Sequence, residues 1–143
     1  SKVIAEAEIP DGKFGHIDHN SYEKDDNTNY LNFEHAKINK ELLLYYRELI
    51  TLRKKHEVFR RSTPENFNFL QTADTFLVAY ELTHKNNTYL VALNGSQKDQ
   101  QFDLPQGSWQ RLVDGEAVYL KRGRKEKNKI VIPATSGWVL KRK

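Results

Sequence analysis

Residues 19–33 carry the side chains best suited to binding chemistry. The stretch reads HNSYEKDDNTNYLNF and has no glycine, no proline and no helical or strand period. Its carboxylates and amides can hydrogen-bond hydroxyl groups, and its aromatic rings can stack on the faces of a ligand. Such a mixture is typical of either a solvated loop or a loop that recognises a sugar. The residues that would contact a sugar are Tyr22, Asp25, Asp26, Asn29, Tyr30 and Phe33.

Other chemistries have less support in the sequence. His16, Asp18 and His19 are close together, but no regular element fixes their geometry around a metal ion. The chain has no serine elbow and no phosphate loop, and it has no cysteine. Asp25 and Asp26 are adjacent in a loop, unlike the two separated carboxylates of a glycosidase. We therefore expect no metal, no cofactor and no catalytic residue, so that the chain alone is inactive.

The composition describes one globular, rather polar chain. It has 143 residues, of which 38% are apolar and 29% charged, which is enough for one core. No run approaches 18 apolar residues, so we expect no membrane-spanning segment. The net charge is +4, and the basic excess is concentrated in KRGRKEKNK at 121–129, where Tyr119 is the one aromatic neighbour, and in KRK at 141–143. A solvated hairpin loop is expected there, and no nucleic-acid site. The absence of methionine suggests a piece cut from a longer chain.

The elements that must position these residues begin with a helix. Apolar residues recur at spacings of three and four across residues 38–56, and basic residues crowd the last turn. Because a helix with so wide an apolar stripe is not stable alone, it must pack on a partner. We expect Tyr46, Leu49 and Ile50 to be buried against the rest of the domain.

After residue 66 the pattern changes to short runs rich in β-branched and aromatic residues, separated by turn signals. Seven strands are expected, at 67–71, 75–84, 87–95, 100–105, 108–115, 129–134 and 137–143. The predicted fold is therefore mainly β: an antiparallel β-sandwich preceded by an irregular loop and one long amphipathic helix.

The order of these motifs resembles the C-terminal end of the α-amylase superfamily of glycoside hydrolases, most closely its pullulanase branch. That branch carries Asn-Ser-Tyr, two residues, Pro-Asp, two residues, Asn, three residues and Trp. The matching residues are Asn20, Ser21, Tyr22, Asp26 and Asn29, while Asp25 replaces the proline and Phe33 the tryptophan. The family's last barrel helix is matched by Tyr45, Tyr46, Leu49, Ile50, Leu52, Arg53, His56, Phe59 and Arg60.

The resemblance implies a (β/α)₈ barrel that hydrolyses α-glucans with retention, through an Asp nucleophile and a Glu acid/base that this chain lacks. Residues 1–62 would be the remnant of that catalytic barrel, and residues 63–143 the C-terminal β-sandwich domain. Tyr22, Asp25, Asp26 and Asn29 would bind substrate at the rim of the sugar cleft. The implied partners are the missing barrel and, through the parent enzyme, starch, pullulan or glycogen.

Two alternatives remain open from the sequence. A stand-alone carbohydrate-binding module would need an exposed aromatic pair on the sandwich, such as Trp109 and Trp138. A basic adaptor for nucleic acid or protein would use the cationic run at 121–129. The sequence leaves α-1,6 versus α-1,4 specificity, the cellular compartment and the oligomeric state undetermined.

Overall fold

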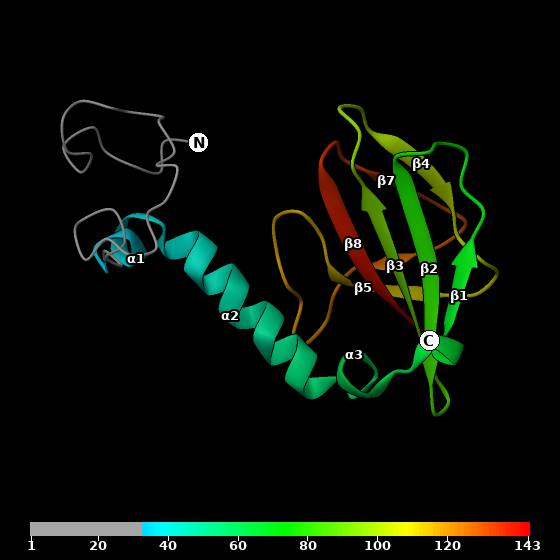
Figure 1. Ribbon diagram of the computed structural model, residues 1–143, viewed down its shortest axis with the longest axis horizontal. Coiled ribbons are helices and arrows are strands. Elements are labelled where there is room, and N and C mark those ends of the chain that lie inside the picture. Colours follow the sequence, from blue (N-terminus) through cyan, green and yellow to red (C-terminus); the bar gives the residue numbers. More distant parts are fainter. Residues whose placement is uncertain (1–32) are drawn as a thin grey trace, which may run out of the picture. The chain divides into compact units, whose positions relative to one another are not determined.

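The computed structural model describes residues 33–143. These residues form α1 (His35–Ile38), α2 (Lys40–Lys55), α3 (Val58–Arg61), a 3-10 turn (Pro64–Asn66) and then the strands (Figure 1). The described residues divide into two units, one that ends at Leu44 and a second that comprises Tyr45–Lys143. The irregular loop expected before the helix lies outside the described residues. The domain boundary expected between residues 62 and 63 stays a prediction.

Helix α2 confirms the expected helix, with Glu41 in its first turn and three basic residues in its last. Its contacts differ from the prediction. Leu52 is buried and Leu49 packs beside it, but Tyr46 and Ile50 are 59% and 52% exposed. The prediction of burial is therefore wrong for Tyr46 and Ile50. Successive helical residues are about 100° apart, so the sheet covers only one arc of the wide stripe, the arc that carries Tyr45.

All seven expected strands are present, with one addition. Their bounds are β1 (Phe67–Leu70), β2 (Leu77–His84), β3 (Asn87–Asn94), β4 (Gln100–Asp103), β5 (Trp109–Val113), β7 (Lys129–Ile132) and β8 (Ser136–Arg142). The addition is β6 (Lys125–Glu126), a two-residue strand that lies in the basic run and pairs with β5. So short a strand has no readable alternation, which is why the sequence did not reveal it.

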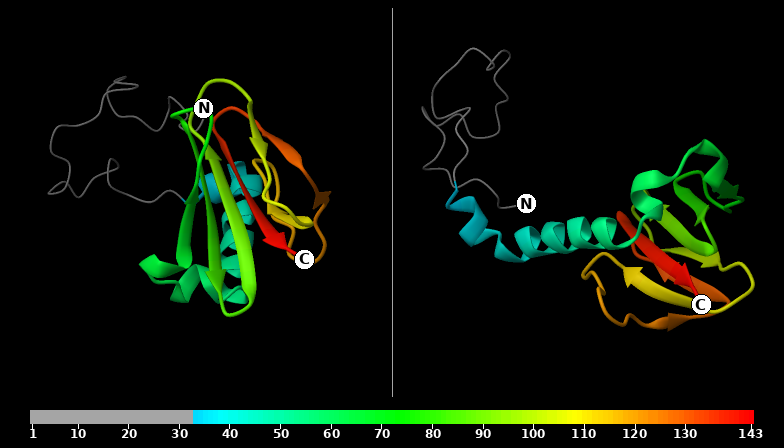
Figure 2. Two further views of the ribbon diagram at one scale, coloured as in Figure 1. Left: turned by 90° about the vertical axis from the view of Figure 1, so that its right-hand side faces the viewer. Right: turned by 90° about the horizontal axis from the view of Figure 1, so that it is seen from below.

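The strands form two antiparallel sheets, as the predicted β-sandwich requires. The larger sheet has the order β1-β2-β3-β8-β5-β6, and β4 pairs with β7 in a smaller one. Most of these strands carry labels in Figure 1, and Figure 2 shows the ribbon from two further sides. Of the helices in residues 33–143, none has the length and apolar character needed to cross a lipid bilayer.

The larger sheet carries a hydrophobic cluster on each face, because successive side chains of a strand point to opposite sides. On one face, Ala79 and Leu90 pack with Phe102 and Ile132 of the smaller sheet. The second cluster brings residues of the larger sheet and of the β5–β6 connection together with α2 and α3; its buried members are Leu52, Val58, Leu82, Tyr89, Leu112, Val113 and Val118. The second half of α2 is thus part of the same folded unit as the strands.

Candidate functional site

The predicted sugar-binding residues, Tyr22, Asp25, Asp26 and Asn29, lie outside the described residues, as do the histidines at 16 and 19. Their roles stay predictions. Within residues 33–143, no three His, Cys, Asp or Glu side chains form a group that could hold a metal ion.

The two tryptophans are core residues. Trp109 is fully buried and Trp138 is 7% exposed, and both belong to the cluster between the sheets. The Trp109 Nε1–H donates to the Pro105 carbonyl at 2.9 Å, and the Arg111 guanidinium lies 3.5 Å from the centre of the Trp138 ring. The expectation that this pair is exposed for sugar stacking is therefore wrong. Large aromatic rings at inward positions of β5 and β8 bury more apolar surface than any other residue type.

Polar contacts fix α2 to the segment between β5 and β6. The Tyr45 hydroxyl donates to the Asp114 carbonyl at 2.8 Å, and the Lys55 ammonium donates to the Leu120 carbonyl at 2.6 Å. The two side chains stand ten positions apart on α2, almost three helical turns. They therefore hold the second half of the helix at both ends.

The Asp114 carboxylate organises that segment. It accepts hydrogen bonds from the Tyr119 hydroxyl at 2.8 Å, from Arg111 at 3.0 Å, and from the backbone N–H groups of Glu116 and Ala117. Burial opposes its ionisation, but these hydrogen bonds outweigh burial and hold the pKa of Asp114 below its ordinary value. Arg111 also pairs with Glu126 at 2.6 Å, which ties the basic run to β5.

One face of the larger sheet is only partly covered. Phe69 faces Tyr80 across β1 and β2, and Val78 faces Leu93 across β2 and β3. These side chains share the face on which Leu82 packs in the cluster with α2 and α3. Phe69 is nevertheless 70% exposed, and Val78 and Leu93 are also exposed. We call these three exposed apolar side chains, Phe69, Val78 and Leu93, the sheet patch.

A polar concavity of about 220 Å³ lies where the end of α2 meets the β2–β3 hairpin. We call it the basic pocket; its lining residues are Lys55, His56, Glu57, Val58, His84, Lys85, Asn87, Tyr89 and Lys141. His56 Nδ1 and the Tyr89 hydroxyl are 2.8 Å apart in a hydrogen bond. Burial is the largest cause that lowers the pKa of His56, and the positive charges of Lys141 and Lys55 lower it further. No sequence motif predicts this pocket, because its residues come from segments far apart in the chain.

Comparison with known proteins shows what the chain is similar to. Residues 64–117 match the family model of the pullulanase all-beta domain. The structure of the pullulanase from Bacillus acidopullulyticus superposes with a TM-score of 0.78 at 28% sequence identity. That match covers 87% of this chain but 16% of the pullulanase chain. No match was found among curated protein sequences.

Two further pullulanase structures have the same fold. Type I pullulanase from Bacillus subtilis, complexed with maltose, gives a TM-score of 0.69 at 22% identity over 82% of this chain and 18% of that one. Pullulanase from Anoxybacillus sp., complexed with maltotetraose, gives 0.66 at 22% identity over 78% of this chain and 17% of that one. The resemblance expected from the sequence is confirmed: residues 64–117 match the pullulanase all-beta domain, and the chain resembles the C-terminal part of a pullulanase.

Proposed function

We propose that this chain is the C-terminal part of a starch- or pullulan-type α-glucan hydrolase, with a structural and substrate-rim role and no catalytic carboxylates of its own. The observation that carries the proposal is the similarity to the pullulanase from Bacillus acidopullulyticus, which extends over 87% of this chain but 16% of that one. In this proposal residues 1–62 are the end of the catalytic barrel, and residues 63–143 are the C-terminal sandwich.

The exposed side of α2 supports a missing partner. Tyr46 and Ile50 are exposed on this helix, while Leu49 and Leu52 on its other side pack in the second cluster. A helix that is apolar on both sides is typical of one packed between two layers. The sheet patch adds a second uncovered apolar surface. The barrel of the parent enzyme would cover α2 on the side where Tyr46 and Ile50 project.

The substrate-rim role rests on the opening segment. In a barrel of this type the loops at the carboxyl ends of the strands build the active site, and residues 19–33 would be such a loop. Tyr22, Asp25, Asp26 and Asn29 would there hydrogen-bond and stack against an α-glucan. Two similar pullulanase structures contain maltose and maltotetraose, which supports an α-glucan as the ligand class of the parent enzyme.

A chimaera tests the proposal. The C-terminal region of the Bacillus acidopullulyticus pullulanase is replaced by this chain, and pullulan hydrolysis is measured by the release of reducing sugar. The chimaera is expected to be active, whereas the isolated chain should release no more sugar than a heat-killed control. Asp26→Asn should lower kcat/KM of the chimaera by roughly tenfold or more, the loss of one charged hydrogen bond. Lys98→Gln, an exposed change on the sandwich, should leave kcat/KM unchanged.

Activity of the isolated chain, or a chimaera that Asp26→Asn leaves unchanged, would contradict the proposal in different ways. The first outcome would mean that catalytic carboxylates are present in this chain. The second would mean that residues 19–33 do not reach the substrate.

A stand-alone carbohydrate-binding module is the second candidate, and one row of aromatic rings favours it. Phe67 and Phe69 of β1 flank Tyr80, with ring centroids 5.4 and 5.6 Å from that of Tyr80. Such a row could stack on sugar rings in place of the buried tryptophans. This candidate expects the isolated chain to be retarded in a pullulan-containing gel, and Phe69→Ala to abolish the retardation. The leading proposal expects no retardation of either protein.

A further inference from the structure

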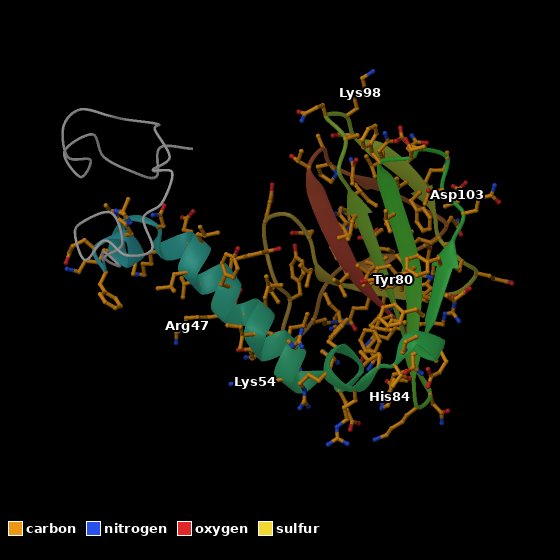
Figure 3. The ribbon with its side chains drawn as sticks, in the orientation of Figure 1. Arg47, Lys54, Tyr80, His84, Lys98 and Asp103 are labelled. Atoms are coloured by element: carbon orange, nitrogen blue, oxygen red, sulfur yellow. The ribbon has the colours of Figure 1, made fainter. Side chains whose placement is uncertain are left out.

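We propose that the basic pocket is a binding site for a phosphate-like oxyanion, carried either by free phosphate or by a sugar phosphate. The site is separate from the proposed substrate rim at residues 19–33, because every residue that lines it lies between positions 55 and 141. The pocket opens to solvent between the end of α2 and the β2–β3 hairpin. His84, the last residue of β2, is labelled at this end of the sheet in Figure 3.

The charges around the pocket favour an anion. Lys55, Lys85 and Lys141 contribute three positive charges, and Glu57 is the one carboxylate among the lining residues. The Glu57 carboxylate is already paired, at 2.7 Å with Lys85 and at 3.2 Å with Arg61. The pocket therefore retains an excess of positive charge, and a concave low-dielectric wall strengthens the attraction of such charges for an anion.

The pocket also holds polar side-chain nitrogens that have no hydrogen-bond partner among the described residues. The His84 Nε2 atom is buried and has no hydrogen-bond partner within the described residues. His56 uses its Nδ1 atom in the bond with Tyr89, which leaves Nε2 for another partner. The Lys141 ammonium lies 5.5 Å from the centre of the Tyr89 ring and forms no ion pair with a carboxylate of residues 33–143. A tetrahedral oxyanion offers acceptor oxygens in several directions and can meet donors from all three residues.

The same features disfavour other small ligands. A metal cation would be repelled by three lysines, and the site supplies one carboxylate that is already bonded. A neutral sugar would gain little from the lysine charges. A phosphoryl group matches both the charge and the donor-rich lining, and the volume of about 220 Å³ admits the group together with part of a sugar ring.

Binding should be visible at His56. In the free protein, burial together with Lys141 and Lys55 lowers the pKa of His56. The other charged or titratable groups lining the pocket are Lys85, Glu57, His84 and Tyr89; Tyr89 is bonded to His56, and Glu57 also contacts Arg61. A bound dianion would favour the imidazolium form and raise the pKa of His56, since an opposite charge stabilises the charged state. General screening by salt would not produce saturation.

The test is an NMR titration of the whole chain with inorganic phosphate, with glucose 6-phosphate and with glucose, at constant ionic strength. We expect saturable shifts of the His56 and His84 ring signals with both phosphates, none with glucose, and a raised pKa of His56 at saturation. Tighter binding of glucose 6-phosphate would identify a sugar phosphate as the ligand, and equal binding would identify the free anion. Lys141→Gln should weaken phosphate binding about fivefold, the effect of one nearby charge in watery surroundings.

Two variants make the result decisive. Lys98→Gln removes the same charge at the opposite end of the sheet (Figure 3) and should leave the affinity unchanged, while Lys141→Arg should restore it. Both substituted lysines are outside the hydrophobic clusters, so the fold should persist. Shifts that do not saturate, or an equal loss in Lys98→Gln and Lys141→Gln, would overturn the proposal, because they would reveal only a general attraction of anions to a basic protein.

Discussion

The two sides of α2 have similar side chains and opposite surroundings. Tyr45, Leu49 and Leu52 contact the second cluster, whereas Tyr46 and Ile50 point away from it into solvent. Both sides offer a tyrosine and a large aliphatic residue, so neither composition nor propensity separates them. The difference lies in what faces them. An apolar side chain contributes to stability only where a partner removes it from water.

The larger sheet repeats this contrast on a single face. Leu82 and Phe69 share that face, but Leu82 packs in the cluster with α2 and α3 while Phe69 is exposed. Phe69 still contacts Tyr80 on the neighbouring strand. Apolar side chains are thus exposed both on α2 and on the larger sheet, where no described segment covers them.

The largest expected effect is a difference in the free energy of unfolding between substitutions on the two sides of α2. Leu52→Ala should lower the free energy of unfolding by about 2–5 kcal/mol, since it deletes a buried side chain and leaves a cavity. Ile50→Ala should change it by less than about 0.5 kcal/mol, because Ile50 is already exposed. Urea unfolding of the isolated chain, followed by tryptophan fluorescence, measures both.

The same pair sharpens the comparison in the pullulanase chimaera. If the barrel covers the outer side of α2, Ile50→Ala should cost the chimaera stability that it does not cost the isolated chain. Equal and small effects of Ile50→Ala in both proteins would mean that the outer side of α2 has no partner.

An effect of intermediate size on stability is expected from Asp114, which lies in the segment between β5 and β6 that contacts α2. Hydrogen bonds hold the pKa of Asp114 below its ordinary value, so the folded state favours the carboxylate. The stabilisation is complete above the unfolded pKa of about 3.9 and is lost as the pH falls through the lower folded pKa. Asp114→Asn should cost about 1–3 kcal/mol near neutral pH and should flatten this acid-side decline.

Urea midpoints measured from neutral pH down to acid test this prediction. Asp103→Asn is the matched control, because the Asp103 side chain is 83% exposed and its contact with Lys129 is 3.6 Å long. Both aspartates are in the same unit, and Asp103 is labelled at the edge of the sandwich in Figure 3. An acid-side decline that survives unchanged in Asp114→Asn would assign the effect to other carboxylates.

Local patterns were sufficient for most of the described fold. The three-to-four period gave α2, and alternation between turn signals gave seven strands, because those signals arise from one segment at a time. The orientation of α2, the burial of Trp109 and Trp138 and the basic pocket depend on which segments meet in space. His56 and His84 are 28 positions apart, and Lys141 is a further 57 away, so no window of sequence contains the pocket.

The smallest expected effect on the free energy of unfolding comes from substitutions of two adjacent tyrosines, Tyr45 and Tyr46. Tyr45→Phe removes the hydroxyl that donates to the Asp114 carbonyl and should cost about 0.5–1.5 kcal/mol, whereas Tyr46→Phe removes an exposed hydroxyl and should cost almost nothing. Burial, then the Asp114 and Tyr46 charges, raise the pKa of Tyr45. The stability that the Tyr45 hydroxyl contributes is therefore present below its unfolded pKa of about 10. That stability is lost as the pH rises through the higher pKa of Tyr45 in the folded state. The stability difference between wild type and Tyr45→Phe should shrink in alkali, while that between wild type and Tyr46→Phe stays near zero. Equal costs for the two variants at neutral pH would mean that the two sides of α2 are not distinguished by their contacts with the sandwich.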